Sequence, residues 1–241
     1  MNTPVRILEQ IRAVTQLVNA GAQKPALRIT TNVPDAPLPV TASKFGGVPY
    51  LPAGVDAPLG SDGQPLGMIA QINCAELPEN TIYPESGMLQ FWLNPRHPQW
   101  GMNINDGLAG ADARVIYWEE LGAANPHACA VEANWEEHHW PIDPPTREIS
   151  LIFGPPQTPD PMLTWGDHER FIDIWNELYP DQAIEEIEEL EDLVEEAGED
   201  EDILSAIADE AGYHQLGGYP VFFDDDPRRN NPELEEYTVN L

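Results

Sequence analysis

The clearest hydrophobic pattern lies at the start of the chain, where apolar side chains recur about every 3.6 residues over 3–20. This spacing predicts an amphipathic helix, and Gly21 fits the position that follows a helix C-terminus. The apolar positions of this predicted helix are Val5, Leu8, Ile11, Val14, Leu17 and Val18.

Further helices are predicted in the last third of the chain, over 168–179, 181–197 and 202–211. Pro180 ends the first of them, and Asp181 is a typical N-cap for the second. The second helix carries an apolar seam. We favour packing of this seam on its own domain, and the alternative is a partner-binding helix. The seam comprises Ala183, Ile187, Leu190, Val194 and Ala197.

The first 155 residues are predicted to be rich in β-structure, because short apolar runs alternate there with turn residues. Residues 43–66 are dense in Gly and Pro and favour ordered turns rather than a helix. The predicted strands are Ala26–Val33, Met68–Asn73, Met88–Asn94, Arg114–Trp118 and Ile149–Phe153.

An internal repeat is the most informative feature of the sequence. Ser43–Tyr50 and His214–Val221 begin 171 residues apart and share the pattern polar-polar-apolar-Gly-Gly-x-Pro-x. A Gly-Gly step before x-Pro fits a sharp corner with positive φ or with a close approach of another segment to the backbone. Two copies, each leading through turns to a strand, indicate an internal duplication.

We therefore expect a single domain over 1–241 with an α+β fold. It would contain two related β-rich halves, formed by duplication of a GGxP-turn-strand unit, with an acidic helical segment between them. The N-terminal helix and the first half occupy 1–165, the acidic segment 166–213, and the start of the second half 214–241. We expect this second half to be incomplete, because the chain ends at Leu241 inside a predicted strand.

The motifs of 43–94 and 214–241 resemble the YwqG-like family of uncharacterised bacterial proteins. They are SKFGG-x-P-x-LP-x-G, DG-x-PL, AQIN and GMLQFW in the first region, and HQ-x-GGYP followed by DPR in the second. The resemblance implies an α+β fold with two related halves and brings no established activity. Some members lie near toxin–immunity clusters, which implies a role in protein–protein interaction. Where relatives carry a Gln shortly before Asp-Pro-Arg, this chain has Asp224 and Asp225.

The charge of the chain excludes several classes of partner. The sequence has 42 Asp and Glu against 11 Lys and Arg, a formal net charge of −31, which disfavours nucleic acid and anionic membranes. Residues 181–202 hold 13 of the carboxylates and no base, and the rest of the chain is still acidic. There is no long apolar run and no signal-peptide pattern, and Cys74 and Cys129 are too few for a disulfide framework. These features predict a cytoplasmic protein.

Catalytic and metal-binding motifs give weak signals. The sequence has neither a G-x-S-x-G nucleophile motif nor a phosphate-binding Gly-rich loop, so we do not predict an enzyme. A divalent cation at Asp224, Asp225 and Asp226 is an alternative to a solvated turn, which we favour because the oxygens are not spaced as in a calcium loop. We disfavour zinc at 136–139, with His127 and Cys129 upstream, because the ligand spacing is poor.

The repeated motif supplies the sharper site hypothesis. Lys44 is one of two lysines in the chain, and if the halves pack about a pseudo-dyad, the two Gly-Gly corners would converge on an anion-binding cleft. The favoured alternative is that Gly-Gly-x-Pro only builds a corner, with Lys44 in a surface ion pair. The candidate ligand-binding residues are Lys44, Gly46, Gly47, His214, Gln215, Gly217, Gly218, Tyr219 and Arg228.

The sequence thus favours a non-enzymatic protein-interaction module of immunity or adaptor type, which binds a basic protein and no nucleic acid or membrane. The alternative is a small-ligand or metal-binding protein, or an enzyme, whose site lies in a cleft between the two halves. A third interpretation is that the acidity only adapts the protein to salt.

Overall fold

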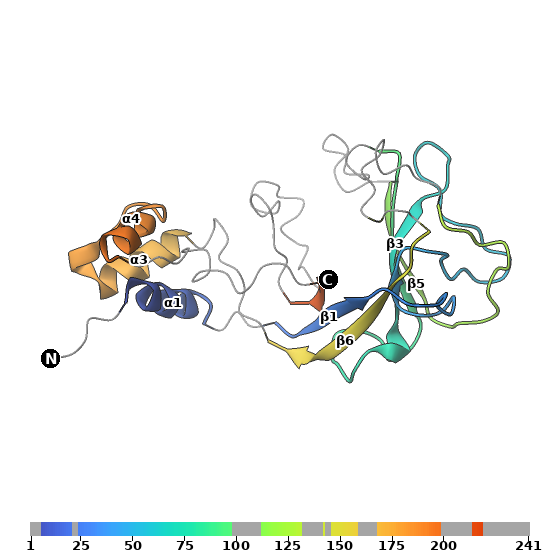
Figure 1. The fold of residues 1–241 in the computed structure, drawn as a ribbon, viewed down its shortest axis with the longest axis horizontal. Coiled ribbons are helices and arrows are strands. Elements are labelled where there is room, and N and C mark those ends of the chain that lie inside the picture. The colour runs from blue at the N-terminus through green and yellow to red at the C-terminus, as the bar shows by residue number, and fades with distance from the viewer. Residues whose placement is uncertain are drawn as a thin grey trace. The chain divides into compact units, whose positions relative to one another are not determined.

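The computed structural model describes residues 6–20, 24–97, 112–131, 142, 146–158, 168–198 and 214–218. The chain divides into two compact units, one formed by Ile29–Pro155 and the other by Met1–Arg28 together with Pro156–Leu241. Helices and an antiparallel sheet occur together (Figure 1), so the predicted α+β class is confirmed. None of the described helices is long and apolar enough to cross a membrane.

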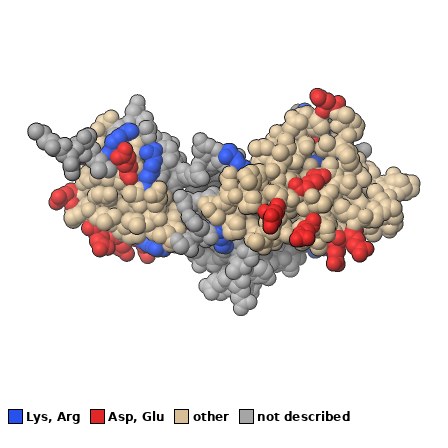
Figure 2. All heavy atoms as spheres, turned by 90° about the horizontal axis from the view of Figure 1, so that it is seen from below, with Lys and Arg blue, Asp and Glu red and all other residues tan. Residues whose placement is uncertain are grey.

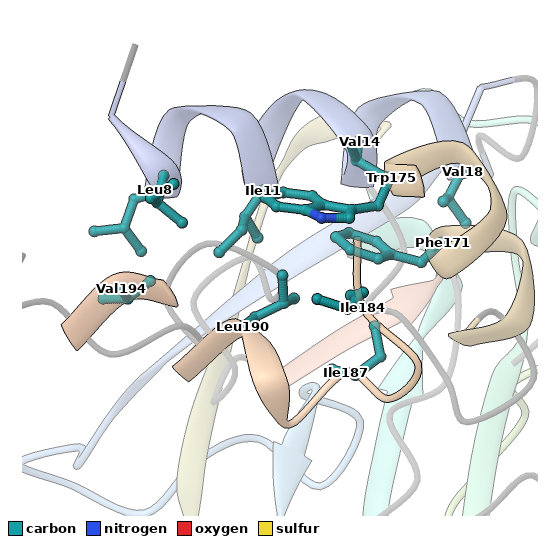
Figure 3. Packing of buried hydrophobic residues seen from close by; sticks show 11 residues of the cluster. Leu8, Ile11, Val14, Val18, Phe171, Trp175, Ile184, Ile187, Leu190 and Val194 are labelled. Atoms are coloured by element: carbon teal, nitrogen blue, oxygen red, sulfur yellow. The ribbon is translucent and has the colours of Figure 1, made fainter. Parts of the chain in front are cut away.

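Among the described residues, the helices of the second unit are α1 (Ile7–Val18), α3 (His168–Leu178) and α4 (Glu189–Glu196). Their apolar faces meet in one buried cluster, which we call the helical core (Figure 3). The predicted N-terminal helix therefore packs with helices from the far end of the sequence, and the compact units differ from the three predicted sub-regions. The buried residues of the helical core are Ile7, Leu8, Ile11, Val14, Val18, Phe171, Trp175, Ile184, Ile187, Leu190 and Val194.

The predicted helix over 181–197 is wrong in extent, since α4 begins only at Glu189 and a 3₁₀ turn covers Pro180–Gln182. The physical reason is the amide of Asn176, which accepts from the backbone N–H of Ile184 and donates to its carbonyl, at 2.9 and 2.8 Å. These bonds use the backbone groups that a continuous helix would need.

Part of the apolar seam that was predicted for 181–197 faces the helical core. Ile187, Leu190 and Val194 are buried as predicted, whereas Ala183 and Ala197 are exposed. Ile184 takes the inward position instead, and the favoured prediction that the seam packs on its own unit is confirmed for the described residues.

The described strands form one seven-stranded sheet in the order β5-β4-β3-β2-β6-β1-β7. The pairs β2–β3, β2–β6, β3–β4 and β4–β5 are antiparallel. The five predicted strands are present, while the two short strands that precede the Gly-Gly steps were not predicted. The strands are β1 (Ala26–Asn32), β2 (Lys44–Phe45), β3 (Gly67–Asn73), β4 (Met88–Leu93), β5 (Ala113–Trp118), β6 (Ile149–Gln157) and β7 (His214–Gly217).

Candidate functional site

Lys44 lies in β2 and is buried, with 1% of its side chain exposed. Its Nζ is 2.6 Å from Oε1 of Glu148, and Oε2 of the same carboxylate accepts from the backbone N–H of Leu38 at 2.8 Å. The structure thus places Lys44 in a buried ion pair rather than at the open surface. Each oxygen of Glu148 accepts one hydrogen bond. This carboxylate therefore links the residue just before β6 to Lys44 in β2 and to the backbone at Leu38.

The Gly46–Gly47 step that follows β2 has the geometry predicted for a sharp corner. Both glycines have positive φ, 65° and 69°, a backbone conformation that is strained for residues with a side chain. A Cβ on Gly47 would collide with the Glu148 side chain, and one on Gly46 would collide with the Arg147 carbonyl oxygen. The two glycines therefore let the residues just before β6 approach the backbone closely and let Glu148 reach Lys44.

Lys44 begins a row of buried polar side chains that runs across three neighbouring strands, β2, β3 and β4. Its register partner on β3 is Gln71, and the register partner of Gln71 on β4 is Gln90. Directly paired residues point to the same face of an antiparallel sheet. Lys44, Gln71 and Gln90, which we call the polar row, are each no more than 1% exposed.

The two glutamines of the polar row clamp the backbone of Tyr50. Gln71 Oε1 accepts from the Tyr50 N–H at 2.9 Å, and Gln90 Nε2 donates to the Tyr50 carbonyl at 2.6 Å. Gln71 Nε2 also donates to the carbonyls of Val40 and Ala42, and Gln90 Oε1 accepts from the indole N–H of Trp118. The polar row therefore holds the Gly-Gly segment against the sheet through satisfied hydrogen bonds.

The DG-x-PL motif has a second set of polar contacts. Asp62 pairs with Arg96 at 2.7 Å, and the hydrogen bond from this guanidinium is the main cause that lowers the pKa of Asp62 to about 2. Nearby, Asp112 accepts from the backbone and hydroxyl of Ser61 and from Asn94. Burial alone would raise the pKa of Asp112, but these hydrogen bonds lower it below its ordinary value. The contacts anchor the turn rather than present a free reactive group.

The second Gly-Gly corner has the same local backbone. Gly217 and Gly218 both have positive φ, 76° and 73°, and the Gly218 N–H donates to the Pro25 carbonyl. His214 is exposed and Gln215 half-buried on β7. Because the two corners belong to different compact units, a ligand site that unites them remains a prediction, as does the duplication.

The remaining candidates fall mostly outside the described residues, namely Tyr219, Arg228, Asp224, Asp225, Asp226 and residues 136–139. Within the described ranges, no three His, Cys, Asp or Glu side chains group as a metal site. Cys129 and His127 are exposed, while Cys74 is buried, and its burial raises the pKa of the thiol.

Sequence reasoning missed Gln71 and Gln90, although a signal was present. Gln90 alternates with Met88 and Trp92 along one strand, and this period of two places it on the face of large apolar side chains.

A family model described as "Domain of unknown function (DUF1963)" matches residues 43–241. The chain belongs to the DUF1963 family. The DUF1963 match includes the polar row, Glu148 and both Gly-Gly corners, and it leaves out α1. A comparison with curated proteins gives no match.

The DUF1963 region also carries a dense acidic surface. Acidic side chains lie on the exposed surface of both units (Figure 2), and residues 181–196 hold nine Asp and Glu and no Lys or Arg. Among the described residues, the exposed members form no ion pair with a Lys or Arg side chain. We call these members the acidic face: Asp181, Glu185, Glu186, Glu188, Glu191, Asp192, Glu195 and Glu196.

Proposed function

We propose that this DUF1963 protein is a non-enzymatic, cytoplasmic interaction module that binds a basic protein partner. The observation that carries the proposal is the acidic face, whose carboxylates have no basic partner among the described residues. The resemblance to YwqG-like proteins supports the same immunity-like or adaptor-like role.

The acidic face is presented by an ordered scaffold. Ile187, Leu190 and Val194 are buried in the helical core, so the carboxylates between them are held outward. Glu189 further orders the segment, because its Oε1 accepts from the backbone N–H groups of Glu185 and Glu186. Like charges at helical spacing repel one another. A basic partner would relieve this repulsion, and the field of the face would speed the encounter.

The first test is capture of partners by the tagged full chain from a lysate of its own host, at about 50 mM and about 500 mM salt. We expect a stoichiometric basic protein that is identified by mass spectrometry and released at high salt. The triple variant E188Q, E191Q and E195Q should slow association of that partner, because it removes three charges from the acidic face.

A matched control removes the same number of exposed charges from the other unit, with D35N, D56N and E79Q. Equal loss in both triple variants would indicate a general charge effect and would contradict the acidic face as the binding surface. Association that does not change with salt would contradict the proposal as a whole. Stabilisation by a metal ion or a metabolite, with no protein captured, would favour the ligand-binding alternative instead.

A further inference from the structure

The strand β5 stands at one end of the sheet order. In the part of the chain that the structure describes, no strand pairs with its outer edge. An edge of this kind presents unpaired N–H and C=O groups that can pair with another strand.

The register identifies which residues of β5 carry the outward groups. The Asn94 N–H donates to the Asp112 carbonyl at 2.8 Å, and the pairing then runs on from Ala113 opposite Leu93. Hydrogen-bonded pairs alternate with non-bonded pairs in an antiparallel ladder. The backbone groups of Ala113, Val115 and Tyr117 therefore point away from β4.

The side chains at these positions are apolar and open to solvent. Val115 is 60% exposed and Tyr117 41% exposed. Tyr117 is held in place, because its hydroxyl donates to the Ser86 carbonyl at 2.8 Å.

Natural edge strands are usually protected by shortness, Pro, a bulge or charged side chains. Over its six residues β5 has only one of these devices, the charged side chain of Arg114. The opposite end of the sheet is different, since β7 has four residues and ends at the Gly-Gly corner. Among the described strands, β5 is therefore the better template for an added strand.

The charges around β5 indicate what kind of strand would fit. Glu119 and Glu120 follow the strand directly and are exposed, and Glu85 is exposed in the turn before β4. Arg114 lies on the opposite face of the strand from Val115 and Tyr117. A second copy is disfavoured as the occupant, because each chain has a net charge of −31.

We propose that the outer edge of β5 binds an extended, basic segment of a partner protein by strand addition. The backbone of Ala113, Val115 and Tyr117 would supply the ladder, the side chains of Val115 and Tyr117 the apolar contact, and Glu119 and Glu120 pairing for Lys or Arg. This inference rests on the proposed function, and it assigns that function a second surface distinct from the acidic face.

The probe is a synthetic peptide of about eight residues that alternates Lys and Val, the length of an ordinary strand. Binding to the full chain is measured by fluorescence anisotropy at physiological salt, beside a peptide of the same sequence with alternate backbone nitrogens methylated. We expect methylation to raise the Kd at least about tenfold, because it removes ladder donors without changing charge. We also expect the Val115 and Tyr117 amides to gain protection from hydrogen exchange when the unmethylated peptide binds.

Val115→Pro is the matched protein variant, because it removes one outward N–H and none that faces β4. This variant should raise the Kd of the unmethylated peptide by a similar factor, while the circular dichroism spectrum of the protein stays unchanged. The methylated peptide keeps the test valid if this variant fails to fold.

Three results would overturn the inference: no binding of the peptide, equal binding of both peptides, or a dimer of the protein that Val115→Pro dissociates. Equal binding of both peptides that is lost in the triple variant E188Q, E191Q and E195Q would overturn it while leaving the proposed function standing. Capture of no basic protein from the host lysate would instead remove the proposed function.

Discussion

The helical core and the polar row are both buried, yet they are built from opposite kinds of side chain. The helical core consists of aliphatic and aromatic residues, and the indole N–H of Trp175 reaches the Gln182 carbonyl at 2.7 Å. The polar row consists of a lysine and two glutamines whose hydrogen-bond partners come from distant segments. Burial in the first case needs complementary shape and one hydrogen bond for the Trp175 indole, whereas burial in the second needs a partner for each polar side chain.

This difference predicts different responses to substitution. Apolar packing is non-directional, so a side chain of similar volume usually replaces another at a small cost. A buried polar group that loses its partner keeps its full desolvation penalty. Changes that preserve volume should therefore distinguish the two regions more clearly than truncations would.

The largest effect is expected for Lys44→Met, which leaves the Glu148 carboxylate without its counter-ion in a site where only 16% of its side chain is exposed. We expect the free energy of unfolding to fall by about 3 kcal/mol, measured by urea denaturation. The double variant K44M and E148Q should recover much of this loss, because the amide oxygen of the new side chain can still accept from the Leu38 N–H. A double variant no more stable than K44M would show that the ion pair itself is needed.

An intermediate effect is expected for Gln71→Met, which keeps the volume of the side chain but leaves the Tyr50 N–H and two carbonyls without their partner. We expect a loss of about 2 kcal/mol. Leu190→Met in the helical core is the matched control and should cost less than about 1.5 kcal/mol. Equal losses in the two variants would erase the distinction between the regions.

The smallest effect is expected for Arg96→Met, because the Asp62–Arg96 pair is about one-third exposed. Stability at neutral pH should hardly change, while the pKa of Asp62, followed by NMR, should rise from about 2 toward 3.8. Since the folded-state pKa is depressed, the stabilisation by this pair is present above about pH 3.8 and is lost as the pH falls through 2. If the pKa of Asp62 does not change in this variant, the hydrogen bond from the Gln64 backbone N–H, rather than Arg96, is the main cause of the lowered value.

Much of the fold could be predicted because it follows from periodicity within short windows. The helices around Ile11 and Phe171 have a clear period of 3.6, and β4 has a clear period of two. The other main strands could be predicted as short apolar runs between turn residues. The prediction failed at residues 183–188, where the Asn176 amide binds the Ile184 backbone and overrides a helical pattern.

The candidate site could be predicted only in part. Positive φ at Gly46 and Gly47 agrees with the Gly-Gly pattern. The burial of Lys44 could not be foreseen, because its partner Glu148 lies 104 residues away and one carboxylate looks like any other in so acidic a sequence.

The clamp on Tyr50 also bears on the order of events in folding. Gln71 and Gln90 lie side by side only once β3 and β4 have paired, so they cannot hold the Tyr50 backbone before that hairpin exists. We expect the segment around Tyr50 to settle after the rate-limiting step. Contacts made that late slow unfolding and hardly change the folding rate, a separation that the two arms of a chevron plot for Gln71→Met would display. The two glutamines would then determine how long the native state lasts more than how quickly it forms.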